Sequence, residues 1–150
     1  EGLKMREIEC AVLGNDDPSA SLPGEYIIKD KAKAFLDYQE KYSATGNNEF
    51  VVPAPVSAEL ASKIQQMAIA AFKAIDGSGL ARVDFFLRSD TGSLLINEIN
   101  TMPGLTEASG YPKMWAGTGL AFRDVLDQLI ELAEQRFDDR ARNQTSRVAD

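Results

Sequence analysis

Two strand-like runs, LARVDFFLR and SLLINEIN, carry four polar side chains whose types suit a divalent cation and an anion bound to it. Paired as a hairpin with Asp84 opposite Glu98, the runs also place Arg82 opposite Asn100, on the same face. Directly opposed side chains have Cβ atoms about 5 Å apart, so two facing carboxylates need a positive charge between them. Two carboxylates and a carboxamide oxygen suit Mg²⁺, which also takes water and substrate phosphates as ligands. Zinc is not expected, because the chain has no His and only one Cys.

The hairpin register is chosen by its side chains, since the SDTG turn leaves it open by one residue. The favoured register sets Arg88 opposite Leu94 and leaves an opposite face that is apolar apart from Asn97. That face consists of Ala81, Val83, Phe85, Leu87, Leu95 and Ile99. A slip of one residue would bury the charges. A second interpretation stays open, in which the polar residues are the solvated face of the hairpin and Arg82 neutralises the acids.

The segment TMPGLTEASG follows the second run and adds hydrogen-bond donors beside the expected cation. These donors are main-chain N–H groups around Gly104 and the hydroxyls of Thr101, Thr106 and Ser109. Such a turn beside a cation can hold an oxyanion, although an ordinary glycine-containing loop has the same residue types. A divalent cation, an arginine and an oxyanion-binding turn together indicate phosphoryl transfer from a nucleotide.

The strands and helices expected around these residues indicate an α+β fold, with a mainly antiparallel sheet and helices packed on one face. Alternation over 7–13 and the run over 25–29 predict two paired strands, and the polar section over 30–48 predicts a long ordered loop. Ser57 is expected to cap a helix that ends near Ile75. A short strand over 49–56 and a helix from about 121 to about 140 complete the set. The last helix is expected to bury an apolar stripe that includes Leu126, Ile130 and Phe137.

The composition limits the class of protein. The 150 residues are 44% apolar and 26% charged, which suits one globular domain. The net charge of −7, without a cluster of Lys and Arg, argues against a nucleic-acid partner. We expect no membrane partner, because no apolar run has transmembrane length, and the lone Cys10 suits the cytoplasm. The first residue is not Met, so we expect a piece of a longer polypeptide, with a lobe over 1–140 and a disordered polar tail over 141–150.

Four stretches, REIECAVLG, AFLDYQEKY, LARVDFFL and NEINTMPGLTEASGYPKMW, resemble the C-terminal half of D-alanine--D-alanine ligases, which are ATP-grasp enzymes. The resemblance covers residues 1 to about 136 and implies the C-terminal lobe of an ATP-grasp fold. It also implies a cytoplasmic homodimer in which ATP phosphorylates one D-alanine and the amine of a second attacks the acyl phosphate. The dipeptide serves peptidoglycan synthesis. Because the first-substrate residues would precede Glu1, we expect the isolated chain to be inactive.

The resemblance also implies a role for each residue near the hairpin. Two Mg²⁺ ions, for which Mn²⁺ can substitute, would be held by Asp84, Glu98 and Asn100. Arg82 and the main chain of Gly104 would stabilise the developing oxyanion and the transferred phosphate. Ser109 and the main chain of Gly110 would bind the carboxylate of the second substrate.

The nucleotide contacts follow from the same resemblance. Glu7 would bond the ribose hydroxyls, and Lys41 would reach the γ-phosphate. The adenine would be held by Leu3, Phe35 and Asn97. Tyr42 would close the 33–48 segment as a lid over the second substrate.

One residue departs from the pattern of the relatives, and two other functions stay open. Gly110 stands where many relatives carry a larger apolar residue, which is expected to loosen the second-substrate pocket. A D-alanine--D-lactate or D-alanine--D-serine ligase would share the metal site. Phenylalanine at the Tyr42 position goes with lactate use in the family, so Tyr42 favours an amine. A non-catalytic ATP-grasp-like binding module would lose Arg82, Lys41 or Asn100, and this chain has all three.

Overall fold

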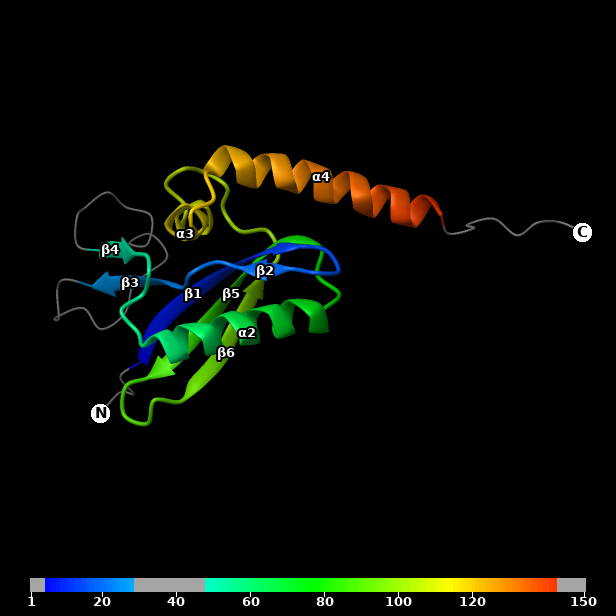
Figure 1. The fold of residues 1–150 in the computed structure, drawn as a ribbon. Coiled ribbons are helices and arrows are strands. Elements are labelled where there is room, and N and C mark those ends of the chain that lie inside the picture. The colour runs from blue at the N-terminus through cyan, green and yellow to red at the C-terminus, as the bar shows by residue number, and fades with distance from the viewer. Residues whose placement is uncertain (1–4, 29–47, 143–150) are drawn as a thin grey trace, which may run out of the picture.

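The computed structural model describes residues 5–28 and 48–142 (Figure 1). The predicted long loop and lid lie outside these ranges, apart from Asn48, which begins a strand. The predicted tail lies outside them beyond residue 142. Four predicted site residues also fall outside: Leu3, Phe35, Lys41 and Tyr42.

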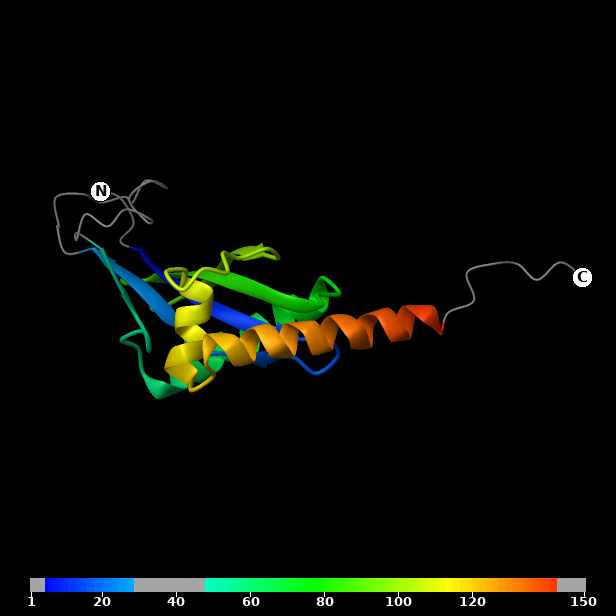
Figure 2. The same ribbon diagram turned by 90° about the horizontal axis from the view of Figure 1, so that it is seen from above.

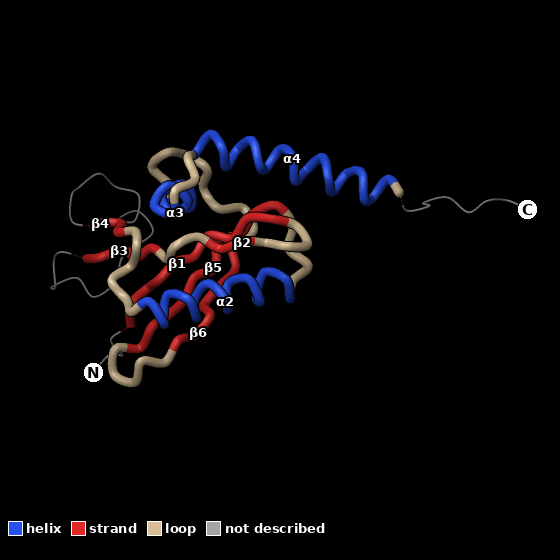
Figure 3. Tube along the Cα trace, viewed as in Figure 1, coloured by secondary structure: helices blue, strands red, loops and turns tan. Residues whose placement is uncertain are grey.

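An antiparallel sheet forms the centre of the described fold (Figures 1 and 3). Its strands lie in the order β4-β3-β1-β5-β6, and the short β2 pairs with β1. Their bounds are β1 Met5–Gly14, β2 Ser19–Ala20, β3 Gly24–Ile28, β4 Asn48–Val51, β5 Gly79–Arg88 and β6 Leu94–Asn100. All the pairings are antiparallel, so the predicted sheet type is confirmed.

Helices cover both faces of the sheet, so the prediction that they pack on one face is wrong (Figures 1 and 2). Their bounds are α2 Ala58–Ala74, α3 Gly110–Thr118 and α4 Phe122–Ala141. Ile8, Cys10 and Val12 of β1 pack in one core with α2. Ala11 and Leu13 pack in a second core with α3 and α4. Because side chains alternate along a strand, β1 contributes to both cores, and the sheet is a central layer with helices on both sides.

The helix α2 forms as the sequence predicts. The side chain of Ser57 accepts a hydrogen bond from the N–H of Leu60 at 3.2 Å, which satisfies a donor of the first turn. Ile64, Ala68 and Phe72 recur every four residues and form the buried stripe that faces the sheet.

The helix α3 was not predicted. Tyr111, Met114 and Trp115 are buried and have helical spacing, but Pro112 and the neighbouring glycines are typical of a loop. Proline is tolerated here because the N–H groups of a first turn have no partner within the helix. Gly119 ends the helix with φ of 101°, a left-handed conformation that glycine adopts without strain.

The helix α4 lies close to its predicted bounds but is less buried than predicted. Val125 is its one fully buried residue. Leu126, Ile130 and Phe137 are 38%, 60% and 73% exposed, so the prediction that they are buried is wrong. The reason is visible in Figure 1, where α4 extends past the end of the sheet. None of the helices in the described ranges is long and apolar enough to cross a membrane.

The β5–β6 hairpin has the predicted register at its polar end. Asp84 faces Glu98, and Arg82 faces Asn100. A β-bulge follows, because the next pair in β6 skips Asn97. The extra residue bends the strand and changes which side chains reach each face.

Beyond the bulge the predicted register is wrong. Leu94 faces Leu87 rather than Arg88, and Leu95 faces Phe86. Leu95 therefore lies on the polar face of the hairpin and not on the apolar face to which the sequence pattern assigned it.

Candidate functional site

A row of acidic side chains crosses three strands on the sheet face that α3 and α4 cover. Glu9 of β1 faces Asp84 of β5, which in turn faces Glu98 of β6. In a neighbouring row, Ala11 faces Arg82. Ala11 belongs to the apolar cluster under α3 and α4. The polar row therefore continues the same face beyond the edge of that cluster.

These rows border a pocket of about 530 Å³. Its lining is Glu7, Glu9, Arg82, Asp84, Phe85, Phe86, Asn97, Glu98, Asn100, Met102 and Gly104. Four of these side chains are acidic and one is basic, so negative charge exceeds positive charge by three. Such an excess suits a ligand that brings cations with it.

Most of the predicted site residues within the described ranges line this pocket. They are Glu7, Arg82, Asp84, Asn97, Glu98, Asn100 and Gly104. Ser109 and Gly110 lie next to it. A Cβ atom at Gly104 would be 2.7 Å from Ser109 Oγ, and one at Gly110 would be 3.0 Å from Glu9 Oε2. The structure thus brings the predicted metal, phosphate and second-substrate residues together.

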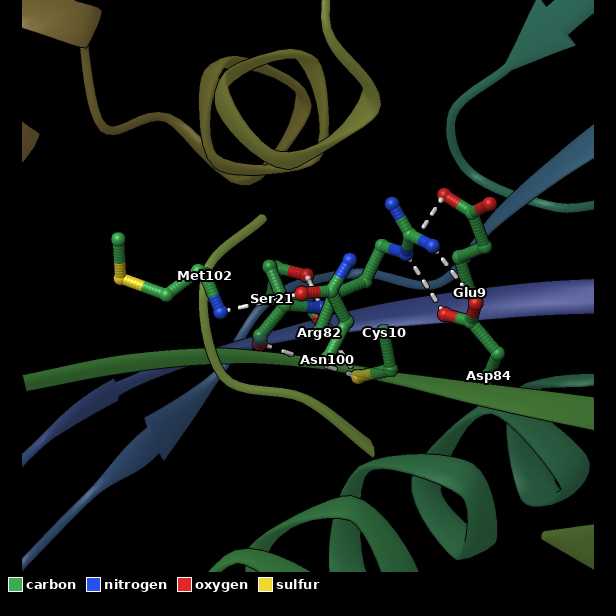
Figure 4. Close-up of polar contacts among 8 residues, drawn as sticks. Glu9, Cys10, Ser21, Arg82, Asp84, Asn100 and Met102 are labelled. Carbon is green, nitrogen blue, oxygen red and sulfur yellow. Dashed lines mark hydrogen bonds and ion pairs between the residues drawn. The ribbon is translucent and has the colours of Figure 1, made fainter. Parts of the chain in front are cut away.

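The guanidinium of Arg82 lies between two carboxylates (Figure 4). Its Nε and Nη2 donate to Oδ1 and Oδ2 of Asp84, each at 2.7 Å. The same Nε is 3.4 Å from Oε2 of Glu9. The side chains of Arg82, Asp84 and Glu9 are 12%, 13% and 5% exposed, so water screens these charges weakly. The planar fork on a carboxylate fixes the orientation of the guanidinium.

The segment between β6 and α3 folds back on Ser109. Oγ of Ser109 lies 2.8 Å from Thr106 Oγ1 and accepts from the N–H of Thr106 at 3.3 Å. Oδ1 of Asn100 accepts from the N–H of Met102 at 3.0 Å. The close approach of Ser109 leaves no room for a side chain at Gly104. Ser109 is also the residue before the first turn of α3, whose N–H groups have no partner inside the helix.

The donor set fits a cation that arrives with a phosphate and does not fit a metal held by protein alone. Within residues 5–28 and 48–142, no three His, Cys, Asp or Glu side chains form a metal-binding group. Asp84 and Glu98 offer carboxylate oxygens, and Asn100 offers an amide oxygen. Octahedral Mg²⁺ would take its other oxygens from phosphate and water. Because Arg82 contacts both oxygens of Asp84, a cation has to share or loosen that contact.

Cys10 takes no part in this pocket. It lies on the opposite face of β1, fully buried in the core with α2. Burial raises the pKa of its thiol to about 12, so the thiol stays protonated near neutral pH. Cys10 is therefore a small buried hydrophobic residue of the core.

Four residues line the pocket that were not among the predicted site residues: Glu9, Phe85, Phe86 and Met102. The signal for Glu9 was present in the sequence, because it alternates with Glu7 and so shares its face. Phe86 depends on the register beyond the bulge. Met102 is 84% exposed and lies in a segment without periodicity.

Comparisons with known proteins identify the family. Residues 1–131 match the family model described as D-ala D-ala ligase C-terminus. The chain belongs to this family. It is 47% identical to the D-alanine--D-alanine ligase of Ruminiclostridium cellulolyticum over 147 residues. The matched stretch covers 97% of this chain and 38% of that relative. The chain therefore spans well under half the length of this curated ligase.

Solved structures of such ligases share the fold. The D-alanine-D-alanine ligase from Coxiella burnetii matches with a TM-score of 0.76 and 43% identity, over 94% of this chain and 35% of that chain. The VanG D-Ala:D-Ser ligase from Enterococcus faecalis matches with a TM-score of 0.71 and 39% identity, over 88% of this chain and 37% of that chain. The D-alanine--D-Alanine ligase from Bacillus anthracis complexed with ATP matches with a TM-score of 0.70 and 27% identity, over 90% of this chain and 41% of that chain. These matches confirm the predicted fold class.

Proposed function

We propose that this chain forms the metal- and phosphate-binding part of an ATP-dependent D-alanine--D-alanine ligase. The observation that carries the proposal is the pocket in which Arg82 lies between acids that face one another across the strands. Its excess of acids suits a triphosphate that binds with divalent cations. Family membership supports D-alanine as the substrate, and the relative complexed with ATP supports the nucleotide.

The proposed reaction joins two amino acids in two steps. A carboxylate oxygen of the first D-alanine attacks the γ-phosphorus of ATP, and the bond to ADP breaks. The amine of the second D-alanine loses a proton and attacks the acyl carbon, and phosphate leaves as the amide bond forms. Both steps place growing negative charge on oxygen atoms, which fixed donors stabilise.

Arg82 is the fixed cationic donor nearest to this chemistry. Together with the main-chain N–H of Gly104, it would stabilise the transferred phosphate and the oxyanion of the second step. Ser109 and the main-chain N–H of Gly110, at the N-terminus of α3, would bind the carboxylate of the second D-alanine.

The cations would be held at the polar end of the hairpin. Asp84, Glu98 and Asn100 would bind two Mg²⁺ ions, or Mn²⁺ in their place, with Glu98 shared by both. When bound, the ions neutralise the charge of the phosphates and orient them. The direct opposition of Asp84 and Glu98 supports this assignment, because facing carboxylates repel one another without a cation.

The nucleoside would lie beyond the bulge. Glu7 would bond the ribose hydroxyls, and Asn97 would contact the adenine, beside the apolar ring of Phe86. The adenine would also contact Leu3 and Phe35. Lys41 would reach the γ-phosphate, and Tyr42 would close the lid, as the family resemblance implies. We include in the proposal a homodimeric enzyme in the cytoplasm, which sedimentation of the full-length protein and cell fractionation would test.

D-serine as the second substrate is the alternative that a specific observation favours. The VanG D-Ala:D-Ser ligase matches this chain nearly as well as the Coxiella burnetii ligase does. Tyr42 argues only against D-lactate, since D-alanine and D-serine both carry an amine. Turnover of the full-length enzyme with D-alanine, D-serine and D-lactate as competing acceptors decides between them.

The replacement Glu98→Gln in the full-length enzyme tests the proposed function. It preserves size but removes the charge that faces Asp84, so we expect kcat to fall about 100-fold or more with the fold intact. The matched control is Glu131→Gln, since Glu131 is exposed on α4 and does not line the pocket. ADP release and dipeptide formation at varied Mg²⁺ give the rates, and circular dichroism reports the fold. Normal turnover of Glu98→Gln at ordinary Mg²⁺ would contradict the assignment.

A further inference from the structure

We propose that Glu9 is a positioning residue for Arg82, and that glycine at position 110 leaves the room for it. The inference rests on the proposed function, which gives Arg82 its part at the reacting phosphate. Glu9 adds a third carboxylate to the row that Asp84 and Glu98 begin, and it comes from the central strand β1 (Figure 4).

Glu9 is buried where an ionised carboxylate needs a cationic partner. It is 4% exposed, and its chain neighbours Ile8 and Cys10 are fully buried in the core. Burying a carboxylate is costly unless a charge or hydrogen bonds compensate for the lost water. Nε of Arg82 lies 3.4 Å from Oε2 of Glu9 and supplies that charge. This contact therefore helps to hold the carboxylate of Glu9 and the guanidinium of Arg82 in place.

Two acids share Arg82 unequally, and the difference gives each a separate role. Asp84 accepts both hydrogen bonds of the fork, at 2.7 Å, whereas Glu9 lies beside Nε. Asp84 is also a proposed metal ligand, and a cation would draw its oxygens away from the guanidinium. Glu9 does not belong to the proposed ligand set. It can therefore keep Arg82 in place while Asp84 turns to the cation.

The start of α3 leaves just enough space for this carboxylate. A Cβ atom at Gly110 would be 3.0 Å from Oε2 of Glu9 and 3.2 Å from Cζ of Phe50. Phe50 packs against Tyr26 with ring centroids 4.6 Å apart, which limits how far it can withdraw. Glu9 and Phe50 thus fill the space beside the Cα atom of Gly110. A larger residue there would push the carboxylate away from Arg82.

The first test compares Glu9→Gln with Glu25→Gln in the full-length enzyme. Glutamine keeps the size of Glu9 and removes its charge. Glu25 is a matched control, because it is 5% exposed on the adjacent β3, bonds Arg6 and does not line the pocket. We expect Glu9→Gln to lower kcat about 10- to 100-fold, as loss of a supporting partner does, while KM for ATP changes less than about twofold. Glu25→Gln should leave both constants near their wild-type values.

A second measurement observes Arg82 without turnover. The ¹⁵N–¹H resonance of its Nε, assigned by its loss in Arg82→Lys, is recorded before and after addition of Mg²⁺ and a non-hydrolysable ATP analogue. We expect Glu9→Gln to shift this resonance and to speed its exchange with water, most strongly with the ligands present. The variant that combines Glu9→Gln with Arg82→Lys should be no slower than Arg82→Lys alone, because Glu9 acts through Arg82.

Gly110→Ala tests the packing half of the inference, and it also serves if Glu9→Gln does not fold. We expect it to lower kcat with Glu9 present and to have little effect in a Glu9→Ser background. Additive effects in this cycle would overturn the pairing of the two positions. An active Arg82→Lys enzyme would overturn the proposed function itself. An inactive Arg82→Lys enzyme beside a Glu9→Gln enzyme with normal kcat and an unshifted Nε resonance would overturn only the role of Glu9.

Discussion

Deleting Asn97 should leave the β5–β6 hairpin paired and remove a side chain from the pocket. Asp84 pairs with Glu98 and Phe85 with Ile96, so Asn97 has no partner of its own in β5. When it is removed, Ile96 and Glu98 become neighbours in a regular strand, and each keeps its present partner. The deletion therefore separates the function of the bulge from the integrity of the hairpin.

The expected loss is in nucleotide affinity rather than in stability. Asn97 is exposed and lines the pocket near Glu7 and Phe86, where we place the nucleoside. A hydrogen bond contributes about 1 kcal/mol net, so one bond from the carboxamide corresponds to about a fivefold change in Kd and two bonds to about 30-fold. The free energy of unfolding should change by less than about 1 kcal/mol, because no buried contact is lost.

Calorimetric titration of the full-length enzyme with a non-hydrolysable ATP analogue and Mg²⁺ measures the affinity, and urea titration measures the stability. The control is Asn97→Ala, which removes the amide but keeps the bulge. Equal losses in both variants would assign the effect to the side chain, whereas a larger loss on deletion would show that the bulge also aims Glu98. Wild-type affinity in both variants would show that Asn97 does not contact the nucleotide.

The remaining predictions concern residues away from the pocket. Arg6→Ala leaves Glu25 buried without its two bonds of 2.6 and 2.7 Å, so the free energy of unfolding in urea should fall by about 1–3 kcal/mol, less than for a fully buried pair because Arg6 is partly exposed. Arg88→Ala, from the exposed pair with Asp90, should leave the urea midpoint unchanged. The pKa of Cys10 rises from 9.0 to about 12 on burial, so between these values the folded state keeps a proton that the unfolded state loses. Stability should then fall as pH rises through that window, and iodoacetamide at pH 8 should label the thiol only along the unfolding transition.

The polar end of the site could be predicted because only one register keeps its charges out of the core. Arg82, Asp84, Glu98 and Asn100 alternate with apolar neighbours, and a slip of one residue would bury the polar side chains of one strand. This penalty alone selects their pairing, and the structure has the predicted pairs.

The bulge could not be predicted because the sequence around it does not alternate. Leu94, Leu95 and Ile96 are consecutive apolar residues, so either register places an apolar side chain on the core face. Burial therefore gives no penalty that would select between a regular hairpin and one with an extra residue. The same ambiguity explains why the core between β1 and the helices α3 and α4 was not predicted. Cys10 to Leu13 is a continuous apolar run, which suits a strand buried on both faces as well as an alternating one.

The three facing acids, Glu9, Asp84 and Glu98, differ in how far they are buried, and this difference indicates from which side a cation enters. Glu9 is 4% exposed and Asp84 is 9% exposed, whereas Glu98 is exposed on the edge strand β6. Arg82 compensates these two buried acids from within the sheet. The repulsion that remains is between Asp84 and Glu98, at the open end of the row. A cation that enters between them meets one carboxylate already fixed by Arg82 and one that can still adjust, which suits an ion delivered with a phosphate rather than one held permanently.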